Sequence, residues 1–197
     1  MQKTIEKSID EAIKAASFLK TQEVSEKIME IAKALVHSYR LGGKVLIAGN
    51  GGSLADACHF AEELVGFYRG YRTPLPAMAL SESCYLTCVA NDEGYEVVFA
   101  RAIDAFGKKE DTFIALSTSG NSINIVKALQ MAKKKGLKTV ALLGKSGGKS
   151  KGVADLEIII EGFETSDRIQ EAHMIILHLL VELVENEYFS TTKDKMT

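Results

Sequence analysis

The sequence predicts an α/β fold in which a parallel sheet is covered by helices on both faces. Short apolar runs alternate along the chain with longer segments that have apolar residues at helical spacing. Several of these short runs end in glycine or serine, as buried strands do when a loop follows. The 197 residues are 46% hydrophobic, which is enough for one domain with a buried core. Such alternation is typical of βαβ units.

Two helices are expected before the first strand. Residues 4–19 place apolar side chains at helical spacing, and residues 22–40 repeat that pattern. Gly42 and Gly43 end the second helix, because glycine readily adopts the conformation found just after helix C-termini. We therefore divide the single domain, 1–197, into N-terminal helices at about 4–40, an α/β core at about 44–188 and a polar tail at 190–197.

The core supplies strands and helices in alternation. Ser53 is a good N-cap residue, so a helix is expected to begin there, directly after the first strand. The expected strands are 44–49, 77–80, 112–117, 138–143 and 156–160. The remaining expected helices are 95–107, 122–136 and 167–188. Parallel strands need crossover connections of this kind, usually helical ones.

Composition and charge exclude several functional classes. A net charge of −2 gives no electrostatic reason to expect a nucleic-acid partner. The three cysteines, Cys58, Cys84 and Cys88, are odd in number and lack metal-like or redox spacing, which favours a reducing compartment over a disulfide framework. The charged N-terminus is unlike a signal peptide, and the longest apolar stretch is too short to span a bilayer. We expect a cytoplasmic protein without a membrane segment.

Glycine-rich polar loops follow three of the predicted strands. The loop after the third strand offers hydroxyl groups and a glycine that lets backbone N–H groups approach a ligand, and the helix after it presents a positive N-terminus. The hydroxyl residues are Ser117, Thr118, Ser119 and Ser122. The plain alternative is that such loops are only turns and caps. Neither GxxxxGK[ST] nor GxGxxG is present, so a phosphorylated small molecule suits this loop better than a nucleotide.

Two helices carry residues suited to acid/base chemistry. His59 and Glu63 lie about 40° apart around the axis of the helix that follows Ser53, away from its main apolar face. Alone, this pair could be a surface ion pair of small worth. In the last helix, His173 lies within the apolar stripe and is expected in the core or at an interface. His178 lies roughly 140° from it, on a second face that suggests packing against another subunit.

Five motifs in register are carried by nearly the whole chain, from about residue 20 to 188: GNGGSLADACHFAEEL, ANDEG, STSGNS, GKSGG and DRIQEAHMIILH. Together they resemble the SIS (sugar isomerase) domain family and, within it, the phosphoheptose isomerases. The resemblance implies a five-stranded parallel sheet in a three-layer α/β/α arrangement, and a homotetramer with active sites at subunit contacts. It also implies conversion of sedoheptulose 7-phosphate to D-glycero-D-manno-heptose 7-phosphate, the first step towards ADP- or GDP-heptose precursors of lipopolysaccharide or other surface glycans.

The resemblance also implies roles for individual residues. Glu63 and His178 match the catalytic acid/base pair. The residues that match zinc ligands, in members where a metal is seen, are His59, Glu63, Gln170 and His178. The expected substrate contacts are Asn50, Gly51, Gly52, Ser53, Glu63, Asn91, Asp92, Ser117, Thr118, Ser119, Ser122, Asp167 and Gln170.

The reaction itself requires an acid and a base of the kind that Glu63 and His178 supply. Aldose–ketose interconversion through an enediol needs a base at the carbon beside the carbonyl and an acid at the oxygen, and a divalent metal could polarise that carbonyl. Gln170 and His178 are eight residues apart, about 12 Å along a helix. They meet at one metal only if they lean towards each other or come from separate copies. Many family members also carry an arginine where this chain has Phe67, and Arg69 is the candidate to replace it.

Two other functions fit an SIS domain. One is a non-catalytic adaptor that binds the bacterial replication initiator, but retention of both Glu63 and His178 argues against it. The other is an isomerase or sensor for another sugar phosphate. Sugar-sensing regulators usually have an added DNA-binding domain, for which 197 residues leave no room.

Overall fold

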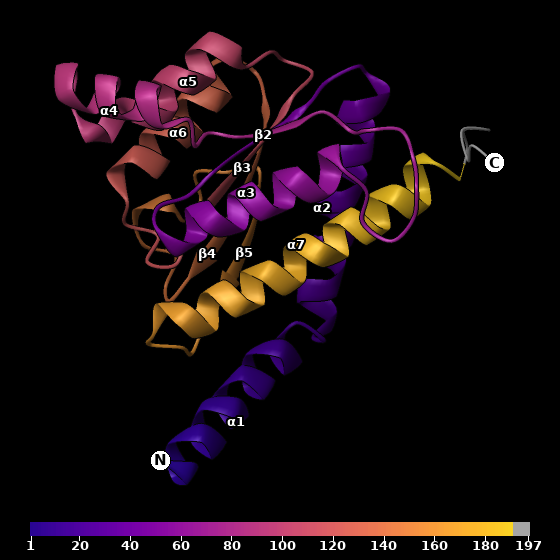
Figure 1. Ribbon diagram of the computed structural model, residues 1–197, viewed down its shortest axis with the longest axis vertical. Coiled ribbons are helices and arrows are strands. Elements are labelled where there is room, and N and C mark those ends of the chain that lie inside the picture. Colours follow the sequence, from indigo (N-terminus) through magenta and orange to yellow (C-terminus); the bar gives the residue numbers. More distant parts are fainter. Residues whose placement is uncertain (191–197) are drawn as a thin grey trace.

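A five-stranded parallel sheet forms the centre of the protein in the computed structural model, which describes residues 1–190 (Figure 1). The strand order is β2-β1-β3-β4-β5, and every neighbouring pair is parallel. The bounds are β1 Val45–Ala48, β2 Ala77–Ala79, β3 Thr112–Ser117, β4 Lys138–Gly144 and β5 Leu156–Ile160. The predicted α/β fold with a five-stranded parallel sheet is confirmed.

Helices cover both faces of the sheet and complete three layers (Figure 1). One cluster of buried side chains joins α2, α3 and α7 to one face, with α1 packed against α7. The other cluster joins α4, α5 and α6 to the opposite face. Alternate strand residues enter the two clusters, Ile47 the first and Leu46 the second, as the pleat requires. The bounds are α1 Gln2–Phe18, α2 Gln22–Arg40, α3 Gly52–Val65, α4 Ser83–Asp92, α5 Val98–Phe106, α6 Ile123–Lys134 and α7 Ser166–Tyr188.

Three local features differ from expectation. Gly51, not Ser53, is the N-cap of α3, and its φ of 56° is readily adopted only by glycine. Helix α4 was not predicted, because it buries only Val89 and therefore shows little apolar periodicity. Its start is marked by Glu82, whose carboxylate accepts hydrogen bonds from two backbone N–H groups of the first turn. The helix expected at 95–107 begins as a short 3₁₀ segment, Tyr95–Val97.

The sheet order places a ligand crevice beside β1. Chain connections leave β1 towards β2 on one side and reach β3 on the other, so the loops after β1 and β3 diverge at the carboxyl edge of the sheet. Two of the three polar loops predicted from the sequence follow these two strands, and the third follows β4. Cys58, Cys84 and Cys88 are free thiols. Among residues 1–190, no helix is long and apolar enough to cross a membrane. Most of the predicted polar tail, 191–197, lies outside the described residues.

Candidate active site

A small hydroxyl-rich pocket lies at the carboxyl edge of the sheet, where the loops after β1 and β3 meet the first turn of α7. Its volume is about 190 Å³. The lining residues are Asn50, Ser53, Leu116, Ser117, Thr118, Ser119, Ser122, Ser166 and Gln170. Seven of the substrate contacts expected from the resemblance thus line one pocket, although they come from three separate parts of the chain. We call this cavity the hydroxyl pocket.

The loop after β3 is held by close packing against the loop after β4. Gly120 has a φ of 65°, and a Cβ atom there would lie 1.9 Å from the carbonyl oxygen of Gly147. Its N–H donates to the backbone and side-chain oxygens of Ser117, and its carbonyl accepts from the N–H of Ser150 at 2.9 Å. The STSGNS and GKSGG motifs therefore form one unit, and glycine at position 120 makes that contact possible.

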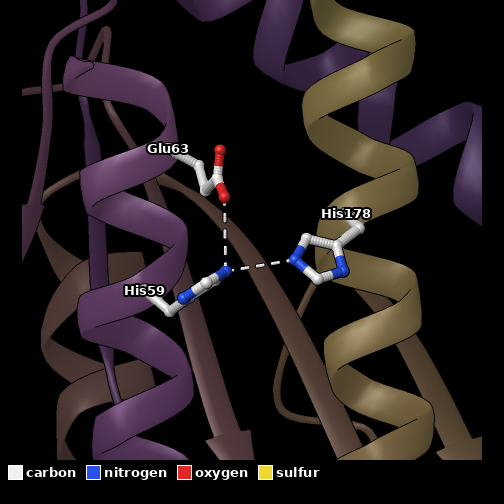
Figure 2. A group of neighbouring side chains, drawn as sticks. All are labelled: His59, Glu63 and His178. Carbon is white, nitrogen blue, oxygen red and sulfur yellow. Dashed lines mark hydrogen bonds and ion pairs between the residues drawn. The ribbon is translucent and has the colours of Figure 1, made fainter. Parts of the chain in front are cut away.

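A second cluster joins α3 to α7 within the same chain (Figure 2). The Nε2 atom of His59 lies 3.3 Å from a carboxylate oxygen of Glu63 and 3.1 Å from the Nε2 atom of His178. The side chain of His59 is 45% exposed and that of Glu63 is 17% exposed. The second face of α7, on which His178 lies, is thus packed against α3. We call these three residues the His–Glu–His cluster.

Tyr68 packs directly against His178, and Arg69 packs against Tyr68. The Tyr68 ring stacks on His178 with centroids 5.7 Å apart and an interplanar angle of 23°. The Arg69 guanidinium lies over Tyr68 and pairs with Glu182 at 2.6 Å, one turn after His178. Phe67, which stands where many relatives have arginine, is 61% exposed. Sequence reasoning missed Tyr68, because nothing in the sequence shows that its loop returns to α7.

Arg72 fixes the C-terminal end of α3, where Glu63 lies. Its guanidinium donates to the carbonyl oxygens of Glu63, Leu64 and Gly66, and it pairs with Glu185 on α7 at 2.7 Å. The Arg72 side chain is only 6% exposed. A buried arginine whose three guanidinium nitrogens all donate therefore ties the two helices of the His–Glu–His cluster together. No motif around Arg72 indicates this role in the sequence alone.

The other expected site residues lie in different surroundings. Gln170 packs against Gly52, where an added Cβ atom would lie 2.5 Å from its amide nitrogen, and it lines the hydroxyl pocket. Asp167 is exposed, and hydrogen bonds from Thr165 and Arg168 hold its pKa at about 2. Asn91 and Asp92 are the last two residues of α4, which covers the face of the sheet opposite to α3 and α7. The Asn91 amide donates to the Asp92 carboxylate at 2.8 Å. Neither residue lines the hydroxyl pocket.

One further titratable group on each of α3 and α7 has a pKa value shifted by burial. Burial raises the pKa of Asp56 to about 6, against the opposing charge of His59. One carboxylate oxygen of Asp56 is buried and has no hydrogen-bond partner within the described residues. His173 is fully buried, with its Nε2 atom 3.1 Å from the Leu143 carbonyl oxygen, and burial lowers its pKa to about 4. The prediction that His173 belongs to the core is confirmed.

The His–Glu–His cluster has the donors and spacing of a zinc site. Its three ligand atoms lie within 4.8 Å of one another. Tetrahedral zinc with ligands about 2.0–2.1 Å away places two nitrogen donors about 3.3 Å apart, close to the 3.1 Å between His59 and His178. At most one hydrogen fits between the two Nε2 atoms, so at least one presents a lone pair. The cluster therefore fits a divalent metal.

Comparisons with known proteins show the family to which this chain belongs. Residues 8–144 match the SIS domain family. The phosphoheptose isomerase of Vibrio cholerae is 51% identical over 170 residues, which cover 86% of this chain and 89% of that protein. That of Fusobacterium nucleatum is 49% identical over 172 residues, 87% of this chain and 88% of that protein. The structure of a phosphoheptose isomerase from Francisella tularensis superposes with a TM-score of 0.89 at 32% identity, over 94% of this chain and 98% of that one.

These similarities extend over nearly the whole chain rather than one motif. They favour an isomerase over the adaptor and sensor alternatives, because both of these relatives, at about half identity, are phosphoheptose isomerases by name. The SIS domain match, the five-stranded sheet and the relatives point to one assignment. The chain belongs to the SIS domain family and, within it, to the phosphoheptose isomerases.

Proposed function

We propose that this protein converts sedoheptulose 7-phosphate to D-glycero-D-manno-heptose 7-phosphate, as an aldose–ketose isomerase. One observation carries the proposal: Glu63 and His178 lie together with His59 in one cluster. They supply a carboxylate and an imidazole on the two helices that border the hydroxyl pocket. The product would be the first intermediate towards nucleotide-activated heptose for a surface glycan. A cytoplasmic location suits this role and the three free cysteines.

The two parts of the site suit the two ends of an open-chain sugar phosphate. Ser53 and Gln170 line the hydroxyl pocket, at the start of α3 and α7. His59 lies about 9 Å further along α3, and His178 about 12 Å further along α7. The phosphate would bind in the hydroxyl pocket, where serine and threonine hydroxyls and the N-terminus of α6 supply donors. The carbonyl end would then reach the His–Glu–His cluster.

Glu63 and His178 would carry the proton transfers. One would take a proton from C1 of the ketose, and the other would donate a proton to the C2 carbonyl oxygen, which gives the enediol. Return of a proton to C2, with loss of the proton on the C1 hydroxyl, gives the aldose, so no atom is gained or lost. The ion pair between Arg72 and Glu185 would keep Glu63 at a fixed distance from α7 throughout.

Zinc is the metal that we propose for the His–Glu–His cluster. His59, Glu63 and His178 would hold it, and Gln170 remains a predicted further ligand that lies beside Gly52. Bound there, a divalent ion would polarise the substrate carbonyl. The protein would hold these metal-ligating atoms in a fixed orientation. The Tyr68 ring does this for His178 by stacking on its imidazole.

A homotetramer with active sites near subunit contacts is part of this proposal. Helix α1 extends from the body of the protein (Figure 1), and Ile5, Ile9 and Ile13 on it are each more than half exposed. A row of exposed isoleucines on one helix face suits burial against another subunit. Light scattering of the wild type and of Ile9→Glu tests this. A wild type that is monomeric at micromolar concentration would reject the tetramer.

Conversion of sedoheptulose 7-phosphate, followed by NMR, tests the proposed reaction. The wild type should produce the aldose phosphate. Thorough chelation should lower the rate, and added zinc should restore it. Absence of turnover in both the zinc-loaded and the chelated protein would reject the isomerase reaction. Full activity after metal removal would reject only the role of zinc.

A further inference from the structure

The side chain of Asn50 has its acceptor capacity filled within the protein. Asn50 follows β1 and lines the hydroxyl pocket. Its Oδ1 atom accepts from Asn124 Nδ2 at 2.9 Å and from the Tyr95 hydroxyl at 2.9 Å, and its Nδ2 atom donates to Asn124 Oδ1 at 3.0 Å. An amide oxygen has two lone pairs and an amide nitrogen has two hydrogens. The side chain of Asn50 therefore has one N–H left to donate to a ligand, and no free acceptor position.

The orientation of this amide is set by the backbone of α6. The N–H of Ile125 donates to Asn124 Oδ1 at 3.0 Å, and a backbone N–H can only donate. The atom of Asn124 that faces it must therefore be oxygen, and its amino group must face Asn50. Since that amino group can only donate, the atom of Asn50 that accepts from it must be the oxygen. Asn124 is 4% exposed, so a reversed Asn50 would leave buried groups without partners.

Tyr95 supports the same orientation from another part of the chain. It belongs to the short segment Tyr95–Val97 that follows α4, and the residue is 56% exposed. Its hydroxyl nevertheless reaches Asn50, 45 positions earlier. Since the second lone pair of Asn50 Oδ1 is occupied in this way, the oxygen has no free position for a ligand hydroxyl.

We infer that Asn124 and Tyr95 are positioning residues, which orient Asn50 as a hydrogen-bond donor to an acceptor oxygen of the substrate. This inference rests on the proposed function, because it assigns a role within that site. Held in this orientation, Asn50 would favour a ligand that presents a hydrogen-bond acceptor to its N–H, such as a phosphate or carbonyl oxygen. It also connects the loop after β1 to the N-terminus of α6, so that the two sides of the hydroxyl pocket keep a fixed relation.

A double-mutant cycle tests the inference. Asn124→Ala and Tyr95→Phe should each raise KM for sedoheptulose 7-phosphate, by about fivefold for one lost hydrogen bond and more for Asn124. In an Asn50→Ala background, each should change KM less than about twofold, because they act through Asn50. Tyr85→Phe, whose hydroxyl donates to the Leu80 carbonyl, is the matched control. Equal effects of Tyr95→Phe in both backgrounds, or no effect in either, would overturn the inference.

A second readout needs no activity. The side-chain amide signals of Asn50 in a ¹⁵N-labelled protein are identified by their loss in Asn50→Ala. Tyr95→Phe should shift these signals, while Tyr85→Phe should not. Since Tyr95→Phe removes one hydroxyl from a largely exposed residue, the fold is retained even where Asn124→Ala is unstable. Unshifted Asn50 signals would overturn the network. A shifted signal in a protein that does not turn over the heptose phosphate would overturn only the proposed function.

Discussion

The Nε2 atoms of His59 and His178 lie 3.1 Å apart, although the two residues are 119 positions apart in sequence and come from different helices. Only one hydrogen fits between two nitrogen atoms at this distance, so at least one of them presents a lone pair. The Tyr68 ring stacks on His178, and the carboxylate of Glu63 pairs with His59, so each imidazole has a further contact. The arrangement is one that a metal, or a single shared hydrogen, would satisfy.

Loss of either histidine should abolish tight zinc binding. With His59→Ala or His178→Ala, two cluster donors remain, so we expect affinity to fall by more than the roughly 10–100-fold that a change beside a metal ligand costs. Competition with a chromogenic chelator measures this. His37→Ala, on the exposed side of α2, is the control and should bind zinc like the wild type. Unchanged affinity in both cluster variants would place the metal elsewhere.

The neighbouring arginines Arg69 and Arg72 should differ in their effect on stability. Arg72→Met leaves Glu185, whose side chain is 15% exposed, without its partner and removes the donor to three carbonyl groups, which should cost about 1–3 kcal/mol of unfolding free energy. Arg69→Met removes an exposed pair with Glu182 and should leave the urea midpoint nearly unchanged. Urea denaturation compares the two variants. Similar midpoints would contradict the structural role of Arg72.

Gly120 should be required for the loop after β3. Gly120→Ala places a methyl group against the Gly147 carbonyl and forces a non-glycine residue to a φ of 65°, at a cost of roughly 1–3 kcal/mol for the backbone alone. Affinity for inorganic phosphate, measured by calorimetry, should fall with it. At Gly70 an added Cβ atom meets nothing within 4 Å, so Gly70→Ala is the control. Equal phosphate affinity in both variants would mean that this loop does not form the phosphate site.

Burial of His173 predicts how stability depends on pH. Its pKa is about 4 in the folded protein and 6.5 when unperturbed, so the unfolded chain binds more protons between these values. Stability should therefore fall as pH is lowered from about 6.5 to about 4. His173→Gln keeps a donor for the Leu143 carbonyl but does not titrate. Denaturation at pH 7.5 and pH 5 should show a smaller loss in this variant, and an equal loss would contradict the assignment.

The sequence predicted the sheet and the hydroxyl pocket because both follow from local patterns. Strand and helix periods are local, and the polar loops after β1 and β3 meet wherever parallel strands end together. Helix α4 was missed because only Val89 on it is buried. Tyr68, Arg72 and Asn124 were missed because their roles depend on contacts between distant segments. The pairing of His178 with His59 within one chain likewise required the crossing of α3 and α7.

The most direct test of the proposed mechanism compares two adjacent glutamates on α3. Glu63 lies in the His–Glu–His cluster, whereas Glu62 is exposed and lies outside it. The measurement is kcat for sedoheptulose 7-phosphate in zinc-loaded Glu63→Gln and Glu62→Gln, with zinc content determined for each. We predict that Glu63→Gln lowers kcat by about 10²–10⁴-fold, the range for loss of a general acid or base, and that Glu62→Gln retains wild-type activity. A Glu63→Gln variant that keeps more than about a tenth of the wild-type kcat would contradict the proposed role of Glu63.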